Sequence, residues 1–367
     1  MTTELSQVIT DIAAGPFGSN LKVECFVPTG FPIIDGANLK GFKVTDNITK
    51  FVTEEKAQSL HRSIARRGDV VVTISGTIGQ IAYIPEDSEY EAYLVSQRQF
   101  RVTFDNTQVF VPYLVYYFHT VQGQHQILSF ANQTGVPALS QPLKNFKKIT
   151  IDLPSLDEQR RIAGILGSLD DKIELNRRIN ANLEEQAQAL FNNISRTSPT
   201  QKGILKDLIE IKYGKDHKNL KDGNIPVYGS GGIMRYVDTP IYENETVLIP
   251  RKGSLNNIIY LNTPFWSVDT MFYSVMKYDH IAKYVYFFLK SKNLSAMNAG
   301  SAVPSMTTDI LYQMKIDIPD KKVFEVYDAI VSPLFLQIQN NQIESNCLST
   351  LRDILLPKLM KGEIKVN

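Results

Sequence analysis

Apolar residues recur at steps of three and four along residues 154–194, between acidic and basic side chains that alternate on the other faces. The recurring positions are Leu166, Leu169, Ile173, Asn176, Asn180, Leu183, Ala187 and Leu190, and two of them are polar asparagines. This is the spacing of a heptad seam, which faces one partner helix. Ser155 can cap the start of the helix, and Ser198-Pro199 can end it. The pattern predicts one helix that is roughly 50 Å long at 1.5 Å per residue.

The same alternation returns after Pro319. Its positions are Val323, Tyr327, Ile330, Leu334, Gln337, Asn341, Glu344, Leu348, Leu351 and Leu355. Aligning Pro154 with Pro319 places Asn176 on Asn341, and polar seam residues fix register and orientation at some cost in stability. We therefore expect the two helices to pair antiparallel, with Asn176 and Asn341 close together. Pro333 predicts a kink or a break in the second helix, because proline removes a helical hydrogen bond.

The segments outside these helices read as mixed α/β globular domains. Short apolar runs bounded by turn residues predict strands at residues 31–36, 69–76, 80–87, 99–104 and 148–153. Residues 111–128 predict one helix opened by Pro112, and its tyrosines, at helical spacing beside Leu and Val, are expected in the core.

Residues 199–318 repeat the plan of residues 1–153 in a shorter form. Six matches occur in the same order, among them 5–9 with 205–209, 68–72 with 244–248, 113–118 with 284–289, and 136–140 with 303–307. Six ordered matches indicate duplication of a unit made of a domain followed by a long helix. We predict two globular domains (1–153 and 199–318), each followed by a helix (154–198 and 319–367), separated by the antiparallel coiled coil and related by a pseudo-two-fold axis.

Composition narrows the function without deciding it. The net charge is +1, and the sequence contains no run of eighteen apolar residues and no signal-peptide pattern. Cys25 and Cys347 are too few for a disulfide framework or a metal cage. The sequence lacks a P-loop, an HExxH motif, an Asn-Pro-Pro-Tyr type motif and a glycine-rich loop for S-adenosylmethionine after a strand. We expect a cytoplasmic protein that has no catalytic or metal site.

A protein with two similar domains suits a partner with two spaced sites, and duplex DNA is the obvious one. DNA contacts need basic, amide and hydroxyl side chains, so we searched turn-rich stretches for them. Gln97, Arg98, Gln99 and Arg101 share one predicted strand. The candidates are Arg66, Arg67, Ser75, Thr77, Gln80, Gln97, Arg98 and Lys147 in the first domain, and Lys212, Lys215, Lys218, Tyr228, Ser230, Arg235, Arg251 and Lys252 in the second.

Two helical motifs carry a family resemblance. Residues 153–162, followed by 169–176, closely resemble the central conserved region of the specificity subunits of type I restriction-modification enzymes, and residues 355–364 resemble their distal conserved region. The resemblance implies two target recognition domains that read a bipartite DNA sequence. It implies helices that act as a spacer ruler and as the dock for two methyltransferase subunits.

The resemblance also implies what the partners bring. The methyltransferase subunits carry S-adenosylmethionine, and the restriction and translocase subunits use ATP and Mg, so this chain would bind no cofactor itself. A second hypothesis stays open: a scaffold that does not bind DNA, in which two domains on a helical strut hold protein partners. DNA binding that falls steeply with salt would separate the two hypotheses.

Overall fold

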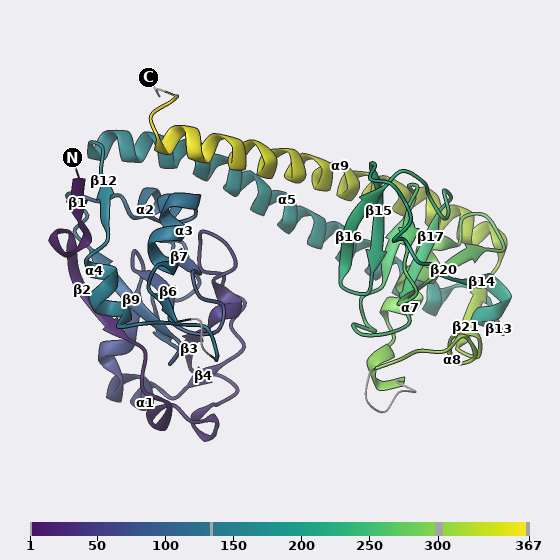
Figure 1. Ribbon diagram of the computed structural model, residues 1–367. Coiled ribbons are helices and arrows are strands. Elements are labelled where there is room, and N and C mark those ends of the chain that lie inside the picture. Colours follow the sequence, from purple (N-terminus) through teal and green to yellow (C-terminus); the bar gives the residue numbers. More distant parts are fainter. Residues whose placement is uncertain (1, 133–134, 298–303, 365–367) are drawn as a thin grey trace. The chain divides into compact units, whose positions relative to one another are not determined.

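The computed structural model describes residues 2–132, 135–297 and 304–364. The chain forms two compact units, one of residues 1–174 with 344–367 and one of residues 175–343. Each unit contains one globular part and one segment of each long helix, α5 (Leu156–Thr197) and α9 (Lys321–Met360) (Figure 1). The predicted division is into four consecutive segments, 1–153, 154–198, 199–318 and 319–367. It differs in kind from a division into compact units, and its boundaries stay a prediction.

Unit 1 is built on two four-stranded sheets. The first has the order β2-β9-β6-β7 and the second the order β4-β3-β8-β5. Their strands are β2 (Ile9–Ala14), β9 (Gln99–Phe104), β6 (Val70–Thr73), β7 (Ile81–Tyr83), β4 (Phe51–Val52), β3 (Phe31–Ile34), β8 (Ala92–Val95) and β5 (Ile64–Arg66). Two short pairs, β1 (Thr2–Glu4) with β12 (Thr150–Asp152) and β10 (Ala131–Asn132) with β11 (Ala138–Leu139), complete it. Its helices are α1 (Glu54–Ser59), α2 (Val111–Phe118), α3 (Val121–Leu128) and α4 (Pro142–Lys147).

Unit 2 repeats this construction with fewer strands. One sheet has the order β14-β20-β17-β18, a second has the order β16-β15-β19, and β13 pairs with β21. The strands are β13 (Thr200–Ile204), β14 (Ile209–Tyr213), β15 (Ile225–Gly229), β16 (Gly232–Val237), β17 (Thr246–Pro250), β18 (Ile259–Leu261), β19 (Trp266–Ser267), β20 (Met271–Met276) and β21 (Lys315–Pro319). The helices are α6 (Leu205–Leu208), α7 (Ala282–Lys290) and α8 (Thr308–Tyr312).

Backbone hydrogen bonds confirm the predicted duplication. Leu5 N–H donates to the carbonyl of Ile149, and Leu205 N–H donates in the same way to that of Met314, both at 2.9 Å. A parallel contact of β3 with β8 in unit 1 has its counterpart in that of β15 with β19 in unit 2. Of the matched residues, Val303 lies outside the described part of the chain. The apolar faces of the sheets and the aromatic helices form the cores.

The aromatic helices are core elements, as predicted, but their length differs. Tyr113 and Tyr116 are 2% and 1% exposed, and Tyr284 is 1% exposed. The single helix expected over 111–128 is wrong, because the chain forms α2 and α3 with a break between them. Thr120 caps α3 through a hydrogen bond that its hydroxyl accepts from Gly123 N–H at 3.1 Å. A local cap at this position stabilises a new helix start.

Within each unit, the segments of α5 and α9 are antiparallel. In unit 2, Asn176 Nδ2 donates to the carbonyl of Asn341 at 3.3 Å, and Asn180 Nδ2 donates to that of Ile338 at 3.3 Å. In unit 1, Lys172 pairs with Glu344 at 3.2 Å, while Arg352 pairs with Asp170 at 2.7 Å. In both units the contact on α9 moves toward its C-terminus as that on α5 moves toward its N-terminus.

The seam of α5 is confirmed, whereas the predicted seam of α9 is wrong in part, because four of its ten positions are exposed: Ile330, Gln337, Glu344 and Leu351. Ile330 is 50% exposed and Leu351 is 45% exposed, while their neighbours Val331 and Arg352 are buried or half-buried against the rest of the unit. Apolar residues stand at both 330 and 331, so spacing alone fits two faces of the helix. The surrounding unit packs against the face that carries Val331 and Arg352, each one residue after a predicted seam position.

Pro333 does not interrupt α9, which runs from Lys321 to Met360. Both Pro333 and Ala329 are exposed. The Ala329 carbonyl, which would accept the missing N–H bond, is therefore on a side of the helix where water can replace it. The expected break at Pro333 is therefore wrong, because the proline lies on the solvent-facing side of the helix.

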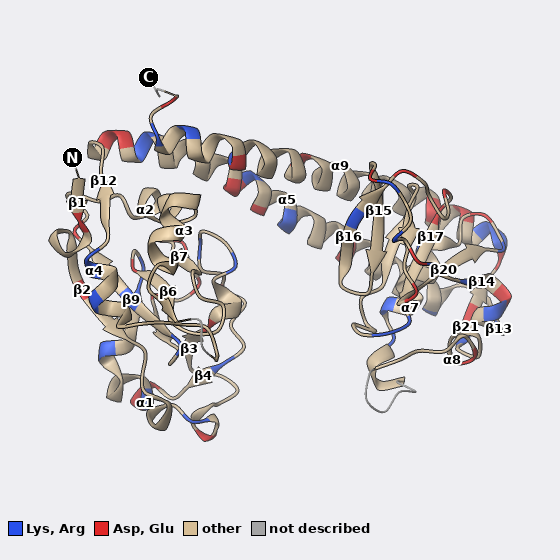
Figure 2. Ribbon diagram, in the orientation of Figure 1, with Lys and Arg blue, Asp and Glu red and all other residues tan. Residues whose placement is uncertain are grey.

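No described helix is long and apolar enough to cross a membrane. Basic and acidic residues are interspersed over both units and along α5 (Figure 2). This mixture directs attention to local groups of residues as the place of a DNA interface.

Candidate nucleic-acid interface

Unit 1 has an open hollow of about 550 Å³ where several segments of the chain meet. They include the turn after β3, the loop after β6 and the turn between β8 and β9, together with residues 21–26 and Lys50. Five predicted DNA-contact residues line this hollow: Ser75, Thr77, Gln80, Gln97 and Arg98. Thr77, Gln97 and Arg98 are exposed. The structure thus brings together residues that the sequence places in two separate stretches.

The loop after β6 has a backbone geometry that unit 2 reproduces after β17. Gly76 N–H donates to the carbonyl of Pro137 at 2.9 Å, and Gly253 N–H donates to that of Pro304 at 3.1 Å. The φ angles of these glycines are 88° and 84°, a region that residues with a Cβ rarely adopt. Ser75 bridges to Ala138 just as Lys252 bridges to Ser305. The two loops are structural equivalents.

Unit 2 has a hollow of about 870 Å³ at the matching place. Lys218 and Ser230 line it, and so does Asp269, a neighbour of Arg251. The Arg251 guanidinium lies over the Tyr213 ring, 5.3 Å from its centre, and donates to the carbonyl of Asp269 at 3.2 Å. These contacts hold Arg251 in one orientation before any ligand binds.

The equivalent turns and loops of the two units carry their arginines at different positions. In unit 1, Arg98 stands on the turn before β9, and the structural equivalent of that residue in unit 2 is Thr270. In unit 2, Arg251 and Lys252 stand on the loop after β17, where unit 1 has Ile74 and Ser75. The pairing is set by equal backbone bonds: Ile74 N–H to Arg98 O at 2.7 Å, and Arg251 N–H to Thr270 O at 2.8 Å.

Several candidates have structural contacts instead. Arg67 donates to the carbonyl of Ser88 at 2.6 Å, and Arg235 donates to that of Leu220 at 2.9 Å. Gln80 Nε2 donates to the carbonyl of Gly36 at 3.1 Å, and its equivalent Asn257 donates to that of Ser230 at 2.9 Å. Each of these side chains joins one segment of its own unit to another.

Five further candidates do not line the hollows. Arg66 and Lys147 are exposed at the ends of β5 and α4. Lys212 pairs with Glu210 on the same strand, and the carbonyl of Lys215 accepts a hydrogen bond from Trp266 Nε1 at 3.0 Å. Tyr228, half-buried on β15, packs against a small cluster around Phe265.

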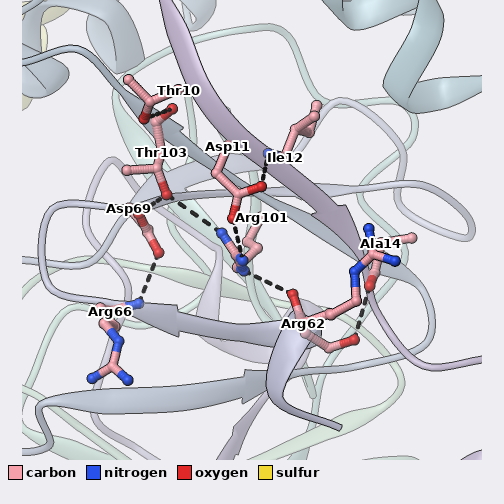
Figure 3. A network of polar contacts seen from close by, with 10 residues as sticks. Thr10, Asp11, Ile12, Ala14, Arg62, Arg66, Asp69, Arg101 and Thr103 are labelled. Carbon is pink, nitrogen blue, oxygen red and sulfur yellow. Dashed lines mark hydrogen bonds and ion pairs between the residues drawn. The ribbon is translucent and has the colours of Figure 1, made fainter.

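Arg101 belongs to a polar network inside unit 1 and is not available to DNA (Figure 3). It is 9% exposed, and it donates to Asp11 Oδ2 at 2.6 Å and to the carbonyl of Arg62 at 3.0 Å. The hydrogen bond from Arg101 holds the pKa of Asp11 below its usual range. Burial raises the pKa of Asp69, which accepts a hydrogen bond from Thr103 at 2.6 Å. Gln99 is likewise buried, at 0% exposure.

The structure adds residues that sequence reasoning missed. Asp35 and Lys50 line the unit 1 hollow as an ion pair of 2.7 Å. Burial raises the pKa of Asp35, but Lys50 and the Ala37 N–H outweigh burial and hold it below its ordinary value. Asp269 lines the unit 2 hollow. An acidic residue was not sought in a DNA interface, although carboxylates accept hydrogen bonds from cytosine.

Among the described residues, no group of three His, Cys, Asp or Glu side chains is placed to hold a metal ion. The hollows combine hydrogen-bond donors, acceptors and a few apolar groups on surfaces open to solvent. This composition suits recognition of a polar, charged partner.

Comparison with known proteins shows which family the chain belongs to. Residues 28–185 and 198–347 each match the family described as type I restriction modification DNA specificity domain. The MjaIX specificity subunit of Methanocaldococcus jannaschii is 22% identical over 362 residues, covering 86% of this chain and 82% of its own. The HindI specificity subunit of Haemophilus influenzae is 19% identical over 390 residues, covering 78% and 84%.

A solved structure has the same fold. The type I restriction-modification S subunit from M. genitalium superposes with a TM-score of 0.58 at 19% identity, covering 98% of this chain and 95% of that one. The two family matches together cover most of the chain and coincide with the two repeats. The chain therefore belongs to the family of type I restriction-modification specificity proteins and carries two copies of its specificity domain.

Proposed function

We propose that this chain is the sequence-specific DNA-recognition subunit of a type I restriction-modification complex, and that each repeat reads one half of a bipartite target. The observation that carries the proposal is one hollow built twice on the same backbone, with different charged side chains. An equal frame suits equal docking on two half-sites, and different side chains suit different base sequences.

The proposal assigns the two long helices to partners. α5 and α9 would dock two methyltransferase subunits and set the number of unread base pairs between half-sites. Methyl transfer would take place in those subunits with S-adenosylmethionine, and ATP and Mg would serve the restriction and translocase subunits. This chain itself would perform no chemical step.

The first experiment measures duplex binding by the full-length chain, alone and with its methyltransferase subunits. We expect the chain to bind a random duplex. The logarithm of the association constant should fall linearly with the logarithm of salt concentration, as phosphate contacts require. Mapping methylated adenines in DNA exposed to the assembled complex should then give one bipartite motif.

A protein scaffold is the competing function. It predicts no salt-dependent duplex binding and normal association with protein partners. A chain that assembles with methyltransferase subunits but neither binds duplex nor directs methylation to one motif would contradict our proposal.

A further inference from the structure

Ile233 and Met234 form an exposed apolar rim on the hollow of unit 2. Their side chains are 50% and 59% exposed, and both line the hollow. Consecutive residues of a strand normally point to opposite faces. Here the register of β15 with β16 shifts between Val227 and Tyr228, which leaves Met234 as an extra residue. Such a bulge redirects side chains, and it brings both neighbours to one rim.

The rim lies beside groups of two other kinds. Lys218 is an exposed donor in the same hollow. Arg251, which lies over Tyr213, donates to the carbonyl of Asp269, a residue that lines the hollow. The carboxylate of Asp269 is an exposed acceptor. Donors, acceptors and apolar groups are the three kinds of contact that distinguish base edges in the major groove of DNA.

The major groove presents one apolar group, the C5 methyl of thymine, and it is wide enough for a two-stranded β-ribbon. β15 and β16 form such a ribbon, and β16 is at the edge of its sheet. Lys218 and the neighbouring Arg251 can meet phosphates, while the carboxylates of Asp216 and Asp269 in the same hollow can accept hydrogen bonds from base amino groups. We propose that Ile233 and Met234 contact a thymine methyl group in the half-site that unit 2 reads. This inference rests on the proposed function.

The test compares thymine with uracil, which pairs with adenine in the same way and lacks only the methyl group. A duplex is first selected by the full-length protein from a randomised pool and is then resynthesised with uracil at single thymine positions. At one position in the unit 2 half-site, uracil should weaken binding by about fourfold, the factor that corresponds to burying one methyl group.

The double variant Ile233→Ser/Met234→Gln should bind the thymine and uracil duplexes alike. Both side chains are exposed, so its melting temperature should stay near that of the unsubstituted protein. Met297→Gln is the matched control, because Met297 is a 40% exposed residue of unit 2 that does not line the hollow. It should retain the full preference for thymine.

Four results would overturn the inference. The first two are a selected half-site without an A·T pair and equal binding of thymine and uracil duplexes at every position. The third is a double variant that keeps the full ratio of thymine to uracil affinity. The fourth is a double variant that keeps this ratio but no longer associates with the methyltransferase subunits. Duplex binding that lacks the methyl dependence rejects this inference alone. No binding to any duplex rejects the proposed function and this inference with it.

Discussion

At the scale of single residues, a basic side chain in a loop is a poor guide to DNA contact until its internal partners are known. Arg67, Arg101 and Arg235 each donate to groups of their own unit. Arg98 is exposed in the first hollow, and Arg251 is held over Tyr213 beside Asp269, which lines the second. Loss of an internally bonded arginine should change stability, whereas loss of an exposed or oriented one should change DNA affinity.

Arg251→Ala should weaken binding to the selected duplex by roughly 1–3 kcal/mol and relax the choice at one base pair, if Arg251 reads a base. If it contacts only phosphate, the loss should be similar on all sequences and the salt slope should fall by about one. Fluorescence anisotropy titrations at several salt concentrations measure both. Arg235→Ala is the comparison, and it should lower stability but keep affinity. Unchanged affinity in Arg251→Ala would remove that residue from the interface.

A buried ion cluster fastens α7 to α9 in unit 2. Lys283 Nζ is 2.6 Å from Glu245 and 2.9 Å from Asp328, and its side chain is 6% exposed. Removing one partner leaves a buried charge uncompensated. Lys283→Met should lower the free energy of unfolding by about 3–5 kcal/mol, measured by urea denaturation. Lys202→Met, whose pair with Asp317 leaves Lys202 87% exposed, should cost at most about 1 kcal/mol. Equal losses would refute this account.

The same cluster predicts how stability depends on pH. Burial alone would raise the pKa of Asp328, but hydrogen bonds from His280 and Lys283 outweigh it and hold this pKa below its ordinary value. Its contribution is therefore lost as pH falls through that lowered value. The hydrogen bond to Asp328 raises the pKa of His280, so the His280 contribution is lost as pH rises from its ordinary pKa of about 6.5 through the raised one.

We therefore expect unit 2 to be most stable at mildly acidic pH. Thermal melting across pH should show this optimum, and His280→Asn should abolish the decline on its alkaline side while keeping the decline on its acidic side. An alkaline decline that survives in His280→Asn would assign it to another group.

At the scale of elements, polar residues in the helix pair are bonded across the seam and not simply tolerated there. Asn341 Nδ2 donates to Asn180 Oδ1 at 2.8 Å, and Asn176 Nδ2 donates to the Asn341 carbonyl. Side chains that need specific partners penalise any shifted register, whereas leucines pack acceptably in several.

Replacing Asn176, Asn180 and Asn341 together with Leu should raise the melting temperature but loosen the register. Disulfide trapping can measure this in a background that lacks Cys25 and Cys347. Cysteines at Lys172 and Glu344, an ion pair in the native register, should cross-link in the parent. Cysteines at Lys172 and Leu351, one heptad away, should cross-link only in the triple variant. The absence of that second cross-link would show that other contacts set the register.

At the scale of the whole molecule, the proposed spacing role of the helices can be tested by length. One heptad added to each helix keeps the seams matched, because seven residues make two turns at about 3.5 per turn. The pair grows by about 10 Å at 1.5 Å per residue, or about three base pairs at 3.4 Å each. The preferred spacer should lengthen by about three base pairs with unchanged half-sites.

Three base pairs also rotate one half-site by roughly 100°, so some affinity should be lost. Methylation of duplexes with fixed half-sites and variable spacers, by the lengthened protein with its methyltransferase subunits, measures the shift. A peak that stays at the original spacer would show that the helices do not set it.

The sequence by itself determined the long helices, the duplication and the family. These features depend on periodicity, on ordered repeats and on local motifs, all of which are properties of neighbours along the chain. The matching of Asn176 with Asn341 could be inferred from the repeat before any contact was known. The buried aromatic helices followed from the same kind of local pattern.

Only the tertiary structure decided which side chains are free to meet a partner. The face of α9 at Ile330 and Val331, the continuity of that helix at Pro333 and the burial of Arg101 all depend on residues distant in the chain. So do the two hollows, since each is lined by residues from separate segments of its unit. The bulge that exposes Ile233 and Met234 depends on strand register, and register is a relation between two strands that one strand's sequence does not contain.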